Sequence, residues 1–299
     1  MGHHHHHDHS SKNIGVTIVL NLGITIAQII GGIISGSMAL LSDAAHNFSD
    51  VLSLIISWAA RRLAGQKLTA NRTFGFKRAE IFAAFINSTT LIVIAVILAF
   101  EAVKRLMHPQ EIEGNIVIWL AGLSILVNGL SVLLIKKDAK NSMNMKSAYL
   151  HLFTDMLTSI AVLIGGILMM YFGWYWVDGV LSLGIAVFLV YSSWAIFAES
   201  LKIMMQFTPK SVDIEKIAIY VQKINGLKNI HHIHVWQLDE HEIIFEAHVD
   251  LENDIHVSEF EIILKEINKI LHQYEINHCN IQPEYSMEDS KDLINNQGH

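Results

Sequence analysis

The sequence predicts an α-helical membrane protein with six transmembrane helices, followed by a C-terminal α+β domain that lies in water. The first observation is composition: 52% of the 299 residues are apolar and only 16% are charged, which is too apolar for an ordinary soluble domain. The second is the presence of six apolar segments of membrane-spanning length. The third is charge: residues 208–299 hold 17 acidic and 7 basic residues, whereas residues 1–207 hold 11 and 14. The two parts of the chain are therefore expected to face different solvents.

Each predicted span contains about 20 or more mainly apolar residues, the length that crosses a bilayer as a helix. The first span is not a signal peptide, because the small residues after it lead directly into another apolar segment rather than into a soluble domain. The six spans cover residues 14–34, 38–63, 81–106, 115–135, 147–172 and 177–205.

The basic residues predict the orientation of these spans. Those after spans two, four and six are Arg61, Arg62, Lys67, Arg72, Lys77, Arg78, Lys136, Lys137, Lys140, Lys146, Lys202 and Lys210. On the other side only Lys104 and Arg105 intrude. Because basic loops stay in the cytoplasm, both termini and the acidic C-terminal part are predicted to be cytoplasmic.

Two similar motifs lie inside the apolar spans. "HNFSD" contains His46 and Asp50, and "HLFTD" contains His151 and Asp155. Residues four apart lie on one helix face, and an ionised aspartate in a membrane is costly and usually functional. Two imidazoles and two carboxylates together suit tetrahedral zinc, and a nitrogen–oxygen set without thiolate favours zinc or cobalt over magnesium, calcium or copper(I).

Other interpretations of the motifs remain open at this point. A single polar pair within a span often forms only an interhelical hydrogen bond, although its repetition favours function. Asp43 and Asn47 either orient the metal ligands or, for Asp43, cap a helix end, and Asp178 is interpreted as the cap of the sixth span.

Two other functional classes are alternatives to a metal transporter. A membrane metalloenzyme needs an open coordination position and a general base beside it, and the sequence supplies no such base, so no enzyme is predicted. A proton-coupled transporter of organic ions, which would use the pairs as a proton relay, is the other alternative.

From Pro209 onward the pattern predicts a small α-β-β-α-β domain with two helices on one face of an open sheet. An apolar helical face begins at Ile214, and "IHHIHVWQL" and "EIIFEAHVDL" are typical of two strands. A second helix follows a capping-box pattern at Ser258 and Glu261, and "HCNIQPE" forms the last strand.

Four stretches together resemble the cation diffusion facilitator family of zinc transporters, in its bacterial zinc, cobalt and cadmium resistance branch. They are "SGSMALLSDAAHNFSD", "FGFKRAEIFAAFIN", "HLFTD" and "HHIHVW", and the resemblance covers residues 13–285. It implies a homodimeric antiporter of the cell membrane that exports zinc in exchange for protons and carries a ferredoxin-like cytoplasmic domain.

The resemblance also implies metal-binding residues. The family's transport site corresponds to His46, Asp50, His151 and Asp155. His231, His248 and Glu284 resemble a cytoplasmic metal site that would bind zinc, and the alternative is surface histidine on strands. Further candidates are His232, His234, His241 and His278.

The remaining predictions concern domain limits and partners. The chain is divided into a His-rich cytoplasmic tail at 1–12, a transmembrane domain at 13–206, a metal-binding domain at 207–285 and a tail at 286–299. The histidine run at 3–9 is either a purification tag or a native metal-collecting segment. Membrane lipid, zinc ions and protons are the expected partners, and the acidic soluble part argues against nucleic acid.

Overall fold

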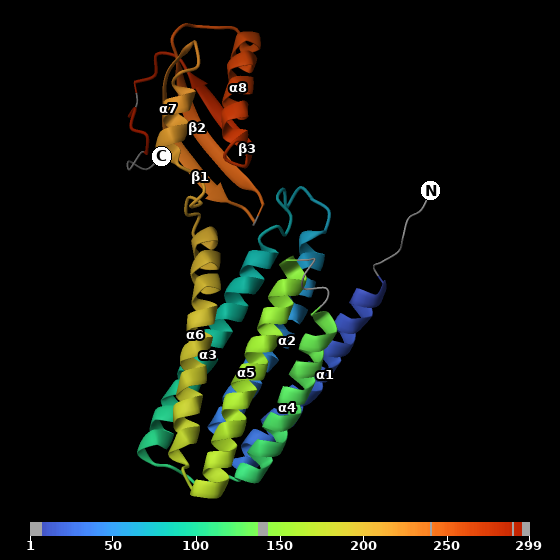
Figure 1. The fold of residues 1–299 in the computed structure, drawn as a ribbon. Coiled ribbons are helices and arrows are strands. Elements are labelled where there is room, and N and C mark those ends of the chain that lie inside the picture. The colour runs from blue at the N-terminus through green and yellow to red at the C-terminus, as the bar shows by residue number, and fades with distance from the viewer. Residues whose placement is uncertain (1–7, 137–142, 240, 289, 295–299) are drawn as a thin grey trace. The chain divides into compact units, whose positions relative to one another are not determined.

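The computed structural model describes residues 8–136, 143–239, 241–288 and 290–294. The chain forms two compact units: one holds the residues up to Trp58 together with Ile86–Phe197, and the other holds Ala59–Phe85 together with Ala198–His299 (Figure 1). The His-rich run at 3–9 lies mostly outside the described residues, and nothing structural follows for it.

Six long helices account for the first two-thirds of the chain, and this part of the predicted fold class is confirmed. They are α1 (Asp8–Ser35), α2 (Met38–Ala64), α3 (Ala79–Met107), α4 (Gly114–Ile135), α5 (Met143–Phe172) and α6 (Trp176–Met204). Within the described residues, α3 to α6 are each long and apolar enough to cross a membrane unaided, while α1 contributes the shorter apolar stretch Leu20–Ser35. Helix α2 is less apolar because it carries Asp43, His46, Asp50 and two arginines.

Small residues let neighbouring helices of the first unit approach closely. Helix α4 lies along both α1 and α5 (Figure 1). A Cβ atom on Gly31 of α1 would lie 1.9 Å from the Leu120 side chain of α4, and one on Gly166 of α5 would lie 3.3 Å from the backbone nitrogen of Ile118. Such close approach is how helices gain packing energy where lipid removes the hydrophobic drive between them.

The N-terminus of α2 is capped by a side chain from α6. The Asp178 carboxylate accepts hydrogen bonds from the Ser37 hydroxyl at 2.6 Å and from the backbone N–H groups of Met38 at 2.9 Å and Ala39 at 3.1 Å. The sequence interpretation of Asp178 as the cap of its own helix is therefore wrong. The buried carboxylate instead satisfies the first amides of α2, which have no partner within the helix.

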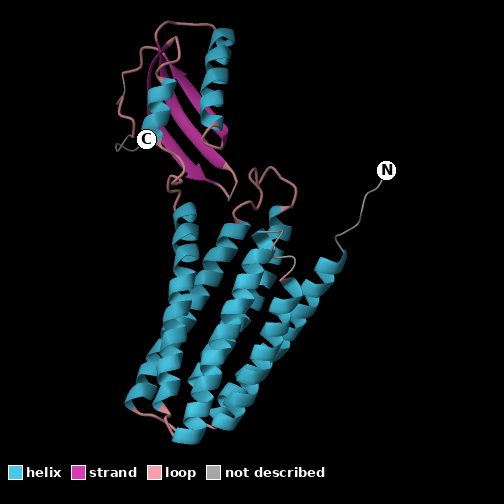
Figure 2. Ribbon diagram, in the orientation of Figure 1, coloured by secondary structure: helices cyan, strands magenta, loops and turns pink. Residues whose placement is uncertain are grey.

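The second unit contains a three-stranded sheet with the predicted α-β-β-α-β order. Strand β1 pairs antiparallel with β2, and β2 pairs parallel with β3 across the α8 crossover. Figure 2 shows both helices on one face of the sheet, over an apolar core that includes Phe245 and Ile267. The elements are α7 (Ile214–Val221), β1 (Leu227–Gln237), β2 (Ile243–Leu251), α8 (Val257–His272) and β3 (Ile276–Glu284).

The predicted capping box of α8 is displaced by two residues. The helix begins at Val257, and the His256 N–H donates to the Glu259 carboxylate at 2.8 Å. The motif predicted at Ser258 and Glu261 does not form because those residues already lie inside the helix.

Candidate metal centres

Helices α2 and α5 turn their His-x-x-x-Asp pairs toward each other. His46 Nε2 lies 3.3 Å from Asp155 Oδ1, and His151 Nε2 lies 3.2 Å from Asp50 Oδ2. Within each helix the corresponding separations are 3.9 Å for His46 and Asp50 and 3.6 Å for His151 and Asp155. Each imidazole therefore faces both carboxylates.

These separations match the size of a tetrahedral zinc site. Bonds of about 2.0 Å to nitrogen and oxygen place neighbouring ligand atoms about 3.3 Å apart in a tetrahedron. The four histidine–aspartate distances range from 3.2 to 3.9 Å, and the ligand atoms of His46, Asp50 and His151 all lie within 4.8 Å of one another, so these three fit a small divalent cation. Asp155 lies beside this group, next to both imidazoles. The two imidazole rings meet edge to face with their centres 5.7 Å apart, which keeps both Nε2 atoms directed at the carboxylates.

The carboxylates of the cluster are partly or fully buried, so they need a nearby positive charge. The Asp155 side chain is 1% exposed and that of His46 is 11% exposed, whereas Asp50 and His151 are 30% and 43% exposed. Neither Asp155 carboxylate oxygen accepts a hydrogen bond in the described part of the chain, and the same holds for Asp50 Oδ2. Because a buried carboxylate is costly without a donor or a counter-charge, the cluster favours a bound cation.

A polar network lies one helical turn from the cluster. The Gln28 amide of α1 donates to Asp43 at 2.6 Å, and the Ser159 hydroxyl of α5 donates to the same oxygen at 3.3 Å. Asn47 donates to Gln28 at 3.1 Å. Asp43 and Asn47 thus tie α1, α2 and α5 together through these bonds and help to fix the two helices that carry the cluster.

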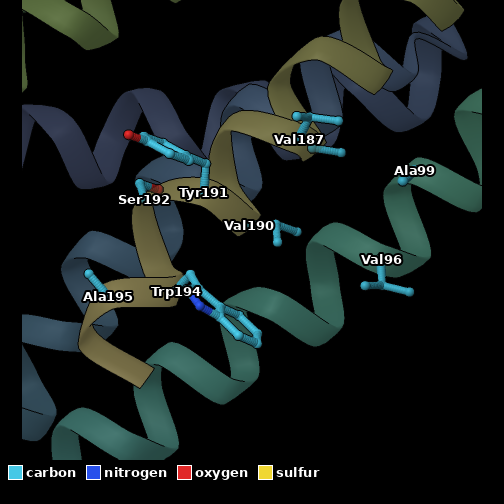
Figure 3. A pocket seen from close by; sticks show the side chains of 9 residues that line it. Val96, Ala99, Val187, Val190, Tyr191, Ser192, Trp194 and Ala195 are labelled. Carbon is cyan, nitrogen blue, oxygen red and sulfur yellow. The ribbon is translucent and has the colours of Figure 1, made fainter. Parts of the chain in front are cut away.

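The groove between α3 and α6 has a different character. Its volume is about 730 Å³, and its polar side-chain groups are the hydroxyls of Tyr191 and Ser192 and the indole N–H of Trp194 (Figure 3). Since no histidine or carboxylate lines this groove, it offers nothing to a metal ion. Six of its lining residues are Val96, Ala99, Val187, Val190, Tyr191 and Trp194.

Comparison with protein-family models shows which family the chain belongs to. Residues 14–205 match the cation efflux transmembrane domain, and residues 209–286 match the cytoplasmic domain of cation efflux proteins. The chain belongs to the cation efflux family. The resemblance to cation diffusion facilitators inferred from the motifs is thereby confirmed, and so is the prediction of a transporter rather than an enzyme.

Curated relatives extend along almost the whole cation efflux chain. The "Cadmium, cobalt and zinc/H(+)-K(+) antiporter" of Bacillus velezensis is 35% identical over 95% of this chain and 92% of the relative. The "Metal cation efflux system protein CzcD" of Cupriavidus metallidurans is 31% identical, with 94% and 90% covered. The "Zinc transporter ZitB" of Escherichia coli is 28% identical, with 99% and 94% covered. This cation efflux protein is therefore a multi-pass membrane transporter.

The three residues of the predicted cytoplasmic site meet at one end of the sheet. His231 lies on β1, His248 on β2 and Glu284 at the end of β3. Glu284 Oε1 lies 2.7 Å from His248 Nδ1, and Glu284 Oε2 lies 3.3 Å from His231 Nε2. One ligand atom from each residue lies within 4.8 Å of the others, so the three side chains fit a single metal ion.

Two further residues belong to this cluster and were missed by the sequence analysis. Asp250 Oδ2 lies 3.6 Å from His231 Nδ1, and the Lys291 ammonium donates to Asp250 Oδ1 at 2.8 Å and to Glu284 Oε2 at 3.2 Å. Asp250 follows His248 by two residues, so the alternation of strand faces could have found it. Lys291 carries no such signal because it lies in the tail after β3.

The other four candidate histidines have different surroundings. His232 stacks on His248 with ring centres 4.7 Å apart, and His234 pairs in register with Glu246 across β1 and β2. His241 and His278 are exposed, the former in the turn between β1 and β2 and the latter on β3. The structure does not bring these four into the group formed by His231, His248 and Glu284.

Proposed function

We propose that this protein exports zinc, and also cobalt or cadmium, from the cytoplasm across the cell membrane in exchange for protons. The transport site consists of His46, Asp50, His151 and Asp155. The single observation that supports this proposal is the convergence of two imidazoles and two carboxylates between α2 and α5, with buried carboxylate oxygens that accept no hydrogen bond. Zinc and cobalt, two of the metals named for the Bacillus relative, are ions that such a nitrogen–oxygen set favours.

Charge balance explains why metal export is coupled to protons. With both aspartates ionised and both histidines neutral, the cluster carries two negative charges, which a divalent cation cancels. After the metal leaves, the bare cluster is costly inside a membrane, and bound protons restore neutrality. Because zinc requires the deprotonated ligands, metal and protons compete for the same atoms, and an inward proton gradient drives the metal outward.

The remaining parts of the proposal concern topology and assembly. The basic loops support a topology in which both termini are cytoplasmic, residues 13–206 lie in the membrane and residues 207–285 form the metal-binding domain. Two copies form a homodimer, and zinc held by His231, His248 and Glu284 offsets the repulsion between two acidic domains. Glu284 and His231, two of the proposed zinc ligands, are both nearly inaccessible to solvent, and buried ligands of this kind favour a bound cation.

Flux into sealed vesicles tests the proposal. Purified protein is reconstituted, and uptake of zinc, cobalt and cadmium is measured singly, with an internal pH dye and with potassium varied independently. The expected result is metal flux accompanied by opposite proton movement, absent in the double variant Asp50→Asn, Asp155→Asn. Undiminished metal-coupled proton movement in that variant would overturn the assignment of the site, and the absence of bound metal between the helices would favour the organic-ion alternative.

A further inference from the structure

The C-terminal tail is held against an irregularity in β1. The pairing of β1 with β2 shifts register between His231 and His234, and His232 adopts a positive φ of 53°. This bulge leaves the N–H groups of His232 and Ile233 available, and they donate to the carbonyls of Asp292 at 3.1 Å and Leu293 at 2.9 Å. The backbone of the tail is therefore fixed directly beside the cytoplasmic cluster.

This anchoring places Lys291 inside the cluster. Its ammonium contacts Asp250 Oδ1 at 2.8 Å, Glu284 Oε2 at 3.2 Å and His231 Nε2 at 3.4 Å. The side chains of Asp250 and Glu284 are 11% and 1% exposed, so two nearly buried carboxylates share this positive charge. Such carboxylates require a counter-charge, and Lys291 provides one from the chain itself.

The ammonium and a metal ion cannot use the site together. Glu284 Oε2 and His231 Nε2 are the atoms that Lys291 contacts, and both would lie about 2.0 Å from a bound zinc ion. A metal there would sit within a few ångströms of the ammonium, and repulsion between the two cations in a nearly buried site would be severe. Binding of one therefore requires departure of the other.

We infer that Lys291 is a built-in cation that fills the cytoplasmic metal site, and that a divalent metal ion displaces it and releases residues 290–294 from β1. This inference rests on the proposed binding of zinc by His231, His248 and Glu284. Asp250 contributes as a positioning residue. It faces Nδ1 of His231 while Nε2 faces Glu284, an arrangement that orients a histidine toward a metal.

Competition with Lys291 raises the zinc concentration at which the cytoplasmic site fills. Removing a competitor that occupies the site in about nine-tenths of the metal-free molecules raises the apparent affinity about tenfold. Low cytoplasmic zinc therefore leaves the tail docked, and higher zinc releases it.

The test uses the protein with Asp50→Asn and Asp155→Asn and with the histidines of the run at 3–9 replaced by alanine, so that neither the bundle nor that run competes with the cytoplasmic cluster for zinc. Zinc affinity is measured by calorimetry, and exchange of the His232 and Ile233 amides is followed by hydrogen–deuterium mass spectrometry with zinc or with chelator. Zinc is expected to accelerate exchange at these amides, and Lys291→Met is expected to bind zinc about tenfold more tightly, because the competitor is gone. Lys291→Arg keeps the charge and should stay near the parent affinity, and Lys228→Met, on an exposed position of β1, is the matched control.

The outcomes separate this inference from the proposal beneath it. Zinc binding with unchanged affinity in Lys291→Met and unchanged exchange at 232 and 233 would overturn the role of Lys291 and leave the metal site intact. No zinc binding in any of these proteins would overturn the cytoplasmic site, and the displacement with it. Tighter binding in Lys228→Met as well would show a general effect of lost positive charge and would also overturn the role of Lys291.

Discussion

The two candidate metal centres use similar side chains but balance their carboxylates differently. In the helical bundle, Asp50 and Asp155 face only imidazole nitrogens among the ion pairs of the described residues. In the C-terminal domain, Glu284 and Asp250 face histidines and also the ammonium of Lys291. The bundle cluster therefore has no lysine or arginine to neutralise its carboxylates among the ion pairs of the described residues, while the domain cluster has a cation of its own.

The largest expected effect is at Asp155, the more buried of the two aspartates in the bundle centre. Asp155→Asn should lower zinc flux in vesicles by more than about 100-fold, since even residues that only support a metal ligand are worth 10–100-fold. The exposed Asp254 provides the control variant Asp254→Asn, which should transport normally. Zinc flux within threefold of the parent protein in Asp155→Asn would remove the contrast between the two centres.

A change of ligand type in the bundle should alter selectivity more than rate. His46→Asp replaces a nitrogen with a third carboxylate oxygen, which favours harder or larger ions. We expect zinc flux to persist at a reduced level and the ratio of cadmium to zinc transport to rise about tenfold. Competition between the two ions in the vesicle assay measures this ratio, and an unchanged ratio would show that His46 does not contact the transported ion.

The corresponding change in the domain should spare transport and affect assembly. Glu284→Gln removes the charge that contacts His231, His248 and Lys291, so zinc affinity of this centre should fall about 10–100-fold. Sedimentation with and without chelator should then show a dimer that no longer tightens with zinc. The exposed Glu252→Gln is the control, and loss of vesicle transport in Glu284→Gln would mean that the two centres are not separable.

The smallest expected effect concerns the network that positions α2 and α5. Gln28→Leu removes a short hydrogen bond to the buried Asp43, which should destabilise the protein by about 1–3 kcal/mol. The thermal unfolding midpoint should fall, and zinc affinity at His46 should change less than stability does. Thr25→Val on the same helix loses only a hydrogen bond to the backbone carbonyl of Asn21, one turn earlier, and should lower the unfolding midpoint less.

Sequence reasoning located the bundle centre because local geometry determines it. His46 and Asp50 share a helix face by their spacing, and the repeat at His151 and Asp155 supplied the partner. The spans themselves followed from length and apolar content, and the predicted edges lie within two residues of the observed helix ends except at the starts of α1 and α5, which begin six and four residues earlier than predicted. Both features can be predicted from local sequence, without knowing which residues far apart in the chain come into contact.

The domain centre depends on contacts that spacing does not encode. Alternation of faces along "HHIH" could not select His231, because the bulge at His232 interrupts the alternation. Lys291 enters the cluster only because residues 292 and 293 bond to that bulge. Asp178 was misassigned for the same reason: its partners, Met38 and Ala39, lie about 140 residues earlier in the chain.

The cap supplied by Asp178 also sets an order for biosynthesis. Helix α2 enters the membrane early, but its first amides receive the Asp178 carboxylate only when the start of α6 has been made. At about 5–20 residues per second, the intervening chain takes roughly 7–30 s to synthesise. During that interval α2 carries uncapped donors near the membrane, which is a costly state. A chain that ends before α6 therefore leaves these two amides unsatisfied, and synthesis of the last helix completes the hydrogen bonding at the start of the second.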